Sequence, residues 1–287
     1  MIYLLLSIVF STLIFVIFKY FDVFKIDTLK AIIVNYIVAF VLGFVLAEID
    51  FSVKELPYQP WFFGAITLGL LFVSIFFVMA LTAQRNGVSV VSVAGKMSVV
   101  IPIIFGVVLY DESLSAIKII GIILAIVAVY LASVKEDLNK HEKAGLVLPA
   151  ILFLGSGAID TILKFIEINY VKENEVSLFS GSLFGFAALF GLLILGFKTI
   201  QKREAFGIKN VIAGIVLGVP NYYSIVFLIK ALQNKNLESS TLFTINNVGI
   251  VVVSTLIGLL LFKESFSLKN KIGIALAITG IILVAIA

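Results

Sequence analysis

The sequence contains no cysteine and a single histidine among its 287 residues. Without cysteine, neither a disulfide framework nor a thiolate metal site can form. The histidine, His141, lies in a polar stretch between two apolar runs, and no cluster of histidine and acidic residues has the spacing of metal ligands. A phosphate-binding Gly-Lys-Ser/Thr loop is also missing, which excludes a self-powered ATP pump. We therefore expect no metal and no cofactor.

Charge is the next scarce feature. Charged residues form 13% of the chain, hydrophobic residues form 61%, and the mean hydropathy is +1.19. Soluble domains carry roughly 25% charged and 45–50% apolar residues, so this chain has more apolar surface than a soluble fold of its length could bury. Lipid must therefore surround much of it. The net charge of +4 reflects loop lysines near anionic headgroups, not nucleic-acid binding.

Apolar runs of the length of a spanning helix, about 20 residues, recur along the chain. They are continuously apolar, whereas the strands of a closed barrel would alternate in polarity. The first run lacks a positive segment before it and a small-residue cleavage site after it, so we expect a helix and not a signal peptide. The sequence predicts an all-α integral membrane protein with ten transmembrane helices, at 2–19, 29–47, 61–83, 88–109, 114–134, 144–165, 176–197, 208–230, 239–262 and 268–286.

The second part of the chain repeats the first. An offset of 152 residues places Glu112 near Glu264 and Gly121 on Gly273. The same offset relates the polar residues of two helices, Ser89 and Ser92 with Thr241 and Thr244. Five predicted helices fall in each half, and an odd number forces the two halves into opposite membrane orientations. The sequence therefore predicts a 5+5 inverted-topology repeat, an architecture of transporters whose substrate site lies at the repeat interface.

Each half also has the same order of motifs. An Ala-Leu pair is followed by a polar helix, a short apolar helix, a Glu-Ser loop and a closing helix with glycine; the pairs are Ala80–Leu81 and Ala231–Leu232, and the loops are Glu112–Ser113 and Glu264–Ser265. This pattern resembles the EamA-type domain, which occurs twice in members of the drug/metabolite transporter superfamily. The resemblance covers nearly the whole chain. It implies a first EamA-like repeat at 1–134 (helices 1–5) and a second at 144–287 (helices 6–10).

The resemblance also implies a multi-pass protein of the cell (inner or cytoplasmic) membrane that exports or exchanges a small metabolite and is not an enzyme. The two repeats differ at two corresponding positions: Pro102 of the first corresponds to Ser254 of the second, and Lys96 corresponds to Val248. Because these departures fall in the polar helices, the resemblance does not identify a substrate.

Lys96 is the first candidate for a substrate contact, because an ionisable group inside a membrane helix is costly unless it has a role. It shares one helix face with Ser89 and Ser92, at spacings of three and four residues. A lysine here could bind a carboxylate or phosphate of the substrate. The alternative, a structural pair with a nearby carboxylate, stays open.

Other polar residues within the predicted helices extend the candidate substrate site. Amides and phenols in membrane helices either bridge neighbouring helices or face a cavity, and both interpretations stay open. Pro220 and Pro102 remove helical hydrogen bonds beside these residues. The further substrate-binding candidates are Thr241, Thr244 and Asn247, which form a stripe matching that of Lys96, together with Asn35, Asn221 and Tyr222.

Asp160 is the candidate for proton coupling, provided that burial favours its neutral form. It lies four residues before Lys164, so a structural pair along the helix is the alternative. Glu112 and Glu264 lie in loops, and capping of a helix is their expected role. The spacings Gly181-xxx-Gly185 and Gly214-xxx-Gly218 predict close helix–helix contacts within the chain.

These features favour a secondary active transporter that moves a small polar metabolite, such as an amino acid, by alternating access. A flippase for a lipid-linked substrate would use the same fold. A membrane enzyme is a remote alternative, because a nucleophile at Gly155-Ser156-Gly157 would need a base within the membrane and His141 is in a loop. The expected partners are the substrate and the lipid bilayer, and the protein is a monomer or homodimer.

The orientation of the termini has two conflicting predictions. Lysine and arginine are more frequent in the odd-numbered connections than in the even-numbered ones. The positive-inside rule then places both termini outside the cell, whereas the family resemblance implies that both are cytoplasmic.

Overall fold

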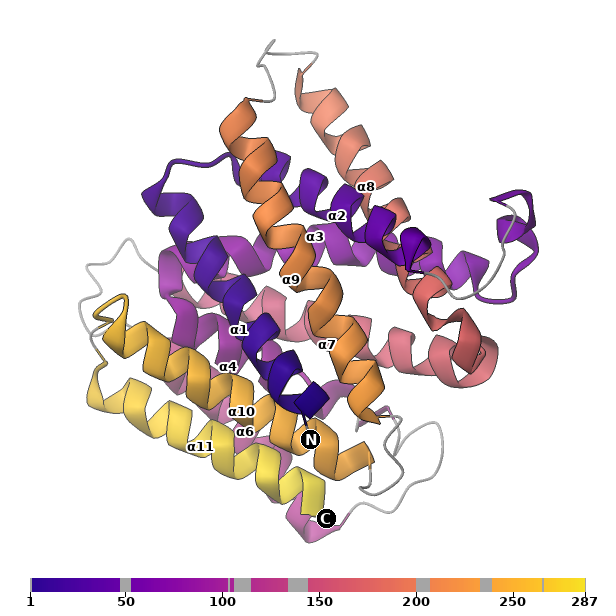
Figure 1. The fold of residues 1–287 in the computed structure, drawn as a ribbon. Helices are drawn as coiled ribbons and strands as arrows, with labels where there is room; N and C mark the ends of the chain where they lie inside the picture. Colours follow the sequence, from indigo (N-terminus) through magenta and orange to yellow (C-terminus); the bar gives the residue numbers. More distant parts are fainter. Residues whose placement is uncertain are drawn as a thin grey trace. The chain divides into compact units, whose positions relative to one another are not determined.

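The computed structural model describes residues 2–46, 53–102, 104–105, 115–133, 144–199, 207–232, 239–264 and 266–286. All regular secondary structure in these ranges is helical (Figure 1). The α-helices are α1 (Ile2–Val23), α2 (Thr28–Val45), α3 (Phe62–Asn86), α4 (Val88–Met97), α6 (Ala116–Ser133), α7 (Ala144–Tyr170), α8 (Val176–Thr199), α9 (Ile208–Leu232), α10 (Ser239–Leu260) and α11 (Leu268–Ile286), and two short 3₁₀ helices are η1 (Val53–Tyr58) and η2 (Glu173–Glu175).

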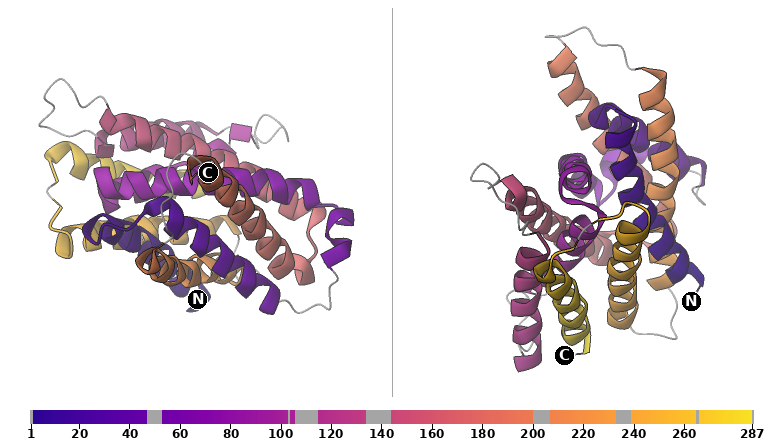
Figure 2. Two further views of the ribbon diagram at one scale, coloured as in Figure 1. Left: turned by 90° about the horizontal axis from the view of Figure 1, so that it is seen from above. Right: turned by 90° about the vertical axis from the view of Figure 1, so that its left-hand side faces the viewer.

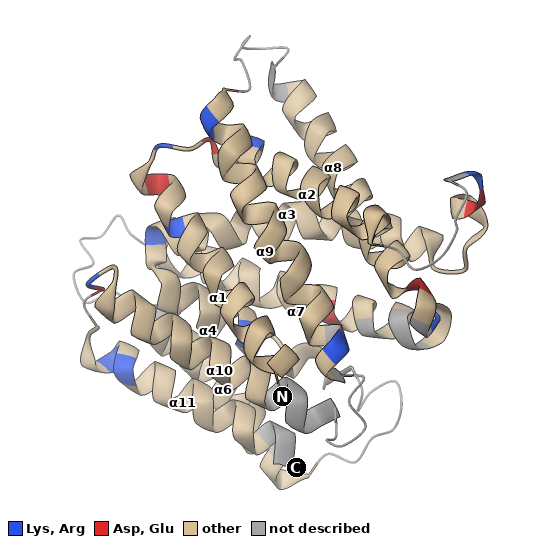
Figure 3. Ribbon diagram, viewed as in Figure 1, with Lys and Arg blue, Asp and Glu red and all other residues tan. Residues whose placement is uncertain are grey.

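Many of these helices are suited to a bilayer. Within the described residues, six are long and apolar enough to cross a membrane: Ile2–Val23, Thr28–Val45, Phe62–Asn86, Gly145–Leu163, Val176–Phe197 and Ile208–Leu228. Shorter apolar helices lie at Val88–Pro102, Ile119–Ala132 and Ile245–Leu260. Charged side chains gather mostly at helix ends and in connections (Figure 3). The prediction of a helical, multi-pass membrane protein is confirmed, and the number ten stays a prediction.

The chain forms two compact units, each assembled from segments distant in sequence. Unit 1 consists of Met1–Tyr20, Val78–Ala158 and Ser224–Ala287, and unit 2 consists of Phe21–Phe77 and Ile159–Tyr223. The boundaries fall inside α1, α3, α7 and α9, so each of these helices contributes to both units. The predicted repeats at 1–134 and 144–287 concern internal sequence similarity, which is a different division of the chain.

In unit 1, α6 and α11 run side by side (Figure 2, right). A Cβ atom on Gly280 would lie 3.3 Å from the Gly121 carbonyl oxygen, and one on Gly273 would lie 3.0 Å from the Ala128 carbonyl oxygen. From one contact to the next, the residue number rises in α6 and falls in α11, so the two helices are antiparallel. The offset of 152 carries Gly121 to Gly273 and Ala128 to Gly280, so it exchanges the two contacts, as a two-fold axis requires.

The core of unit 1 consists of small and aliphatic side chains from α4, α6, α10 and α11. Its buried members include Val93, Met97, Ala125, Val251 and Ala277. Small side chains let helix backbones approach closely, which is how helices associate when lipid is the solvent. The α4 helix packs in this core against both α6 and α10.

In unit 2, α2 packs against α8 and α9 through glycines. A Cβ atom on Gly43 would stand 2.6 Å from the Gly181 Cα atom, so α2 and α8 are in backbone contact. Gly185 faces the Phe40 ring, and Gly214 and Gly218 face Val34 and Val38 of α2 in the same way. The predicted contacts at the two glycine motifs are confirmed, and both motifs use α2 as their partner.

Large aromatic side chains fill the rest of unit 2. Tyr36 is fully buried, its ring centroid lies 5.5 Å from that of Phe76 and 5.9 Å from that of Phe184, and its hydroxyl donates a 3.0 Å hydrogen bond to the Phe72 carbonyl. The chain's one tryptophan, Trp61, is also buried here and donates to Glu175 at 3.3 Å. Burying the polar ends of these side chains with partners avoids the cost of unsatisfied groups.

Candidate functional site

The α4 helix is short because its hydrogen bonding is interrupted before Pro102. It ends at Met97, and Ser98 and Val99 form a turn. Proline has no N–H to donate to the carbonyl four residues earlier, and the Ser98 carbonyl accepts instead from Ile101 N–H at 2.9 Å. The predicted interruption at Pro102 is confirmed, so the run expected at 88–109 does not form one regular helix. By contrast, α9 continues through Pro220.

Lys96 lies in the last turn of α4, where the helix dipole favours a cation. Its side chain is half-buried. The neighbouring Gly95 has nothing within 4 Å of the position that a Cβ would take, so the helix surface at Gly95 borders open space. Ser89 and Ser92, on the same stripe, are buried, and the Ser92 hydroxyl donates to the Ser89 carbonyl at 2.8 Å.

The N-terminus of α4 receives a carboxylate from the connection between α10 and α11. Val88 N–H donates to Glu264 Oε1 at 2.7 Å, and the Ser89 hydroxyl donates to Oε2 at 3.1 Å. Ser89 N–H adds a longer contact to Oε2 at 3.5 Å. An anion at this position satisfies free N–H groups and complements the helix dipole. The expected capping role is confirmed for Glu264; Glu112 lies outside the described residues.

Two glycines shape the space around this carboxylate. Gly87 has a φ of 105° and precedes the helix, and a Cβ there would lie 2.7 Å from Glu264 Oε1. A Cβ on Gly258 would lie 2.6 Å from Oε2. The Glu264 N–H donates to the Gly258 carbonyl at 2.9 Å, and Lys263 adopts a φ of 50°. The carboxylate is therefore held by contacts that leave no room for an added methyl group at either glycine.

The stripe predicted on the ninth run is only partly described. Asn247 of α10 is buried at 7% exposure, and its neighbour Asn246 is buried with no donor to its Oδ1 atom. The side chains of Thr241 and Thr244 lie outside the described residues. Lys96, Ser89, Ser92 and Asn247 all belong to unit 1, where α4 packs against α10.

Unit 2 contains the remaining amide and phenol candidates. Asn35 is fully buried where α2 meets α9, its Nδ2 donates to the Ile32 carbonyl at 3.4 Å, and its Oδ1 receives no hydrogen bond. Asn221 and Tyr222 are also buried, and Tyr222 hydrogen-bonds to the Ser177 side chain of α8. The Tyr222–Ser177 bond matches the interpretation in which such groups bridge helices.

Asp160 differs from its expected environment. Its side chain is exposed on unit 2, so packing within the protein does not supply the burial on which a proton-coupling role was premised. The position of Asp160 along its predicted helix does not say which way its side chain faces. Lys96 belongs to unit 1 and Asp160 to unit 2.

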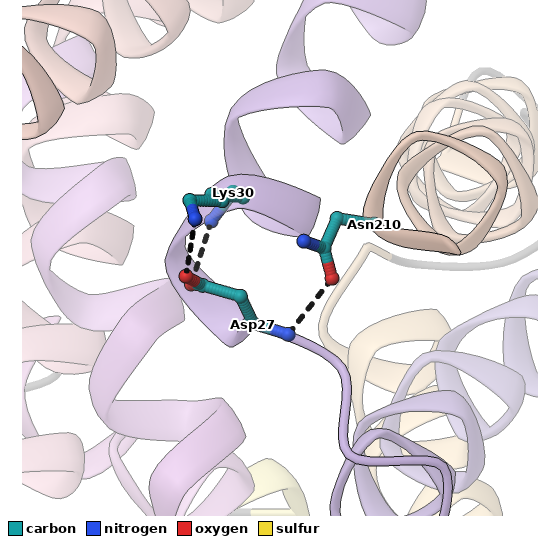
Figure 4. Close-up of polar contacts among 3 residues, drawn as sticks. All are labelled: Asp27, Lys30 and Asn210. Atoms are coloured by element: carbon teal, nitrogen blue, oxygen red, sulfur yellow. Dashed lines mark hydrogen bonds and ion pairs between the residues drawn. The ribbon is translucent and has the colours of Figure 1, made fainter. Parts of the chain in front are cut away.

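A buried charge that no sequence motif indicated lies at the start of α2 (Figure 4). The Lys30 side chain is only 7% exposed and lies 3.3 Å from the Asp27 carboxylate, which is 38% exposed. Asp27 also caps α2 by accepting from Lys30 N–H at 3.2 Å, and the Asp27 N–H donates to Asn210 Oδ1 at 2.9 Å. Asp-Thr before an apolar run is a helix-start signal, but that signal does not reveal that Lys30 is buried.

Comparisons with known proteins give one family. The model of the EamA-like transporter family matches residues 1–134. An uncharacterized protein of Haemophilus influenzae is 30% identical over 262 residues, with 88% of this chain and 86% of the relative covered. The probable glucose uptake protein GlcU of Priestia megaterium is 25% identical over 262 residues, with 86% of each covered. A solved crystal structure covers 97% of both chains with a TM-score of 0.53 and 14% identity, which shows a shared fold alone.

Proposed function

The chain belongs to the EamA-like transporter family, and from that premise we propose that it is a secondary active transporter that moves a small polar metabolite by alternating access. The observation that carries the proposal is the short α4 helix, which has half-buried Lys96 in its last turn, next to Gly95 with open space at its Cβ position. Interrupted helices with polar or charged ends are how transporters bind substrates inside a membrane.

A 5+5 inverted repeat is part of this proposal. The offset of 152 carries α6 (116–133) onto 268–285, which is nearly all of α11, and carries α4 (88–97) into α10. These related helices pack against each other within unit 1. The exchanged glycine contacts of α6 and α11 support an axis that reverses the direction of the chain. Such an axis would place the two halves in opposite orientations, as alternating access by inverted repeats requires.

The division into units supports a bending motion. The unit boundaries fall at 20/21 in α1, 77/78 in α3, 158/159 in α7 and 223/224 in α9. Gly157 and Pro220 lie within a turn of two of these points. Proline and glycine–serine sequences are where helices bend most readily. We infer that α7 and α9 bend at these positions when the site changes its accessibility.

Two substrate classes fit the polar residues. Lys96 favours a metabolite with a carboxylate, such as an amino acid, because a partly desolvated ammonium binds an anionic group strongly. The similarity to the probable glucose uptake protein favours a second candidate, a hexose, whose hydroxyl groups could bind serine and asparagine side chains. A flippase for a lipid-linked substrate remains the alternative with the same fold.

The test is uptake by proteoliposomes that contain the purified protein. Labelled amino acids and glucose are offered separately to wild type, Lys96→Ala and Lys96→Arg. Losing a charge-assisted hydrogen bond should lower transport at limiting substrate by roughly 10- to 100-fold. Lys230→Ala is the matched control, because Lys230 is exposed near the end of α9.

The outcomes separate the candidates. Undiminished transport by Lys96→Ala would remove Lys96 from the mechanism. Uptake of neither class, together with movement of a fluorescent lipid-linked substrate between leaflets, would replace the metabolite transporter by the flippase. If Lys96→Ala abolishes amino-acid uptake and Lys230→Ala does not, the assigned role of Lys96 is supported.

A further inference from the structure

We propose that Glu264 is a positioning residue for substrate binding, because it anchors the N-terminus of α4 and thereby sets where this helix presents Lys96. The role of Lys96 rests on the proposed function, whereas the anchoring of α4 does not. Glu264 and α4 are 176 residues apart in sequence at the Val88 contact. If the predicted repeats are correct, a residue of the second repeat binds a helix of the first.

The first step of the argument is that α4 lacks a cap of its own. Helices usually begin with a Ser, Thr, Asp or Asn side chain that accepts from the first free N–H groups. The N-cap position of α4 is Gly87, which makes no side-chain hydrogen bond. Glu264 supplies the missing acceptor through the Val88 N–H and the Ser89 hydroxyl. The attachment of α4 thus depends on a residue from another part of the chain.

The second step is that the surroundings fit a carboxylate closely. Gly87 and Gly258 bring backbone within reach of the two oxygen atoms, and a methyl group on either would collide with them. The Glu264 backbone is tied to Gly258 as well. This fit fixes the carboxylate in place, so the helix end that it binds is fixed too.

The third step connects the anchor to Lys96. The α4 helix has 10 residues, so it is about 15 Å long, and such a length moves as a rigid rod. At its other end Met97 is buried in the core of unit 1, and the regular hydrogen bonding of the helix stops at Ser98. Glu264 lies at the positive end of the helix dipole and Lys96 at the negative end. A shift at the anchored end is carried along the rod to Lys96.

A spin label can test the anchoring directly, because the chain has no cysteine. Gly95→Cys provides a single attachment site at a position with open space around it. The nitroxide spectrum is recorded in reconstituted protein with native Glu264, with Glu264→Gln and with Gly258→Ala, which displaces the carboxylate without removing its charge. Gly196→Ala is the matched glycine control, since nothing lies within 4 Å of its Cβ position.

Both anchor variants should give a more mobile nitroxide spectrum, and the control should not. Circular dichroism during heating checks that each variant is folded. If Glu264→Gln does not fold, Gly258→Ala carries the test alone. Spectra of the folded variants that match the parent spectrum would overturn the proposal. This readout needs no substrate, so it stands even if the proposed transport function fails.

Transport then tests whether the anchor acts through Lys96. Glu264→Gln should lower uptake at limiting substrate about fivefold to tenfold, the factor that corresponds to one lost cap. In a Lys96→Ala background, the same substitution should cause no further loss, because the residue that it positions is gone. Multiplying losses would show that Glu264 acts elsewhere and would overturn its role in substrate binding while leaving the anchoring measured by the spin label intact.

Discussion

Replacing Asp27 with alanine should destabilise unit 2 through the lysine that is left behind. Lys30 is 7% exposed and Asp27 is 38% exposed, and their charged atoms are 3.3 Å apart. Asp27→Ala removes this carboxylate and also the cap of α2, but keeps the backbone N–H that donates to Asn210. The expected loss therefore has two parts, the broken ion pair of a buried ammonium and a missing cap.

The magnitude follows from the exposure of the two partners. Breaking a fully buried ion pair costs about 3–5 kcal/mol, and the partial exposure of Asp27 reduces this to about 1–2 kcal/mol. Losing the cap adds about 1 kcal/mol. Lys30→Met keeps the apolar stem and leaves a hydrated Asp27 that still caps, so it should stay within about 1 kcal/mol of wild type. The double variant should lose only the cap.

Trp61 allows the stabilities of these single and double variants to be compared by fluorescence. It is the one tryptophan of the chain, is fully buried and belongs to unit 2 together with Asp27 and Lys30. At a fixed heating rate, each kcal/mol corresponds to a shift of roughly 2–4 °C in the midpoint, so Asp27→Ala should lower it by about 4–12 °C. The double variant should recover roughly half of that shift.

The cycle can also refute the reasoning. If Asp27→Ala and the double variant unfold at the same temperature, Lys30 is not a buried charge that depends on Asp27. If Lys30→Met is as damaging as Asp27→Ala, the ammonium itself contributes net stability, contrary to the expected cost of its burial.

Two further substitutions test the packing of each unit. Gly43→Leu should separate α2 from α8, because even a Cβ would stand 2.6 Å from the Gly181 Cα atom. We expect the free energy of unfolding to fall by at least about 1–3 kcal/mol, measured as a lower midpoint of Trp fluorescence. An equal effect of Gly196→Leu would contradict this. Asn86→Ala should cost about 1 kcal/mol by circular dichroism, because Asn86 donates to the Gly145 carbonyl at 2.7 Å; an unchanged midpoint would show that this bond is dispensable.

Helix positions were the most predictable feature of this protein. The runs expected at 208–230 and 176–197 correspond to α9 (Ile208–Leu232) and α8 (Val176–Thr199). The reason is local: a segment in lipid must be apolar for about 20 residues and must satisfy its own backbone hydrogen bonds. The glycine motifs of α8 and α9 were predictable for a similar reason, since closely spaced small residues serve close packing.

The environments of individual polar residues were much less predictable. Asp160 is exposed, so packing does not supply the burial that its proton-coupling role requires, whereas Lys30, for which the motifs gave no signal, is buried. Position along a helix does not determine which face meets other helices. Ser89 was expected to face a substrate, and its hydroxyl donates to Glu264.

Hydropathy and repeated motifs were enough to identify a helical membrane protein of a transporter family, because both can be recognised from the order of the residues. The three-dimensional structure was needed to show that Glu264 caps α4, that α2 packs against both glycine motifs, and that the units are built from interleaved segments. A lipid environment requires apolar helices but does not determine which of them pack together. That is determined by close packing and by the few polar groups that need partners away from water, and both depend on residues far apart in the chain.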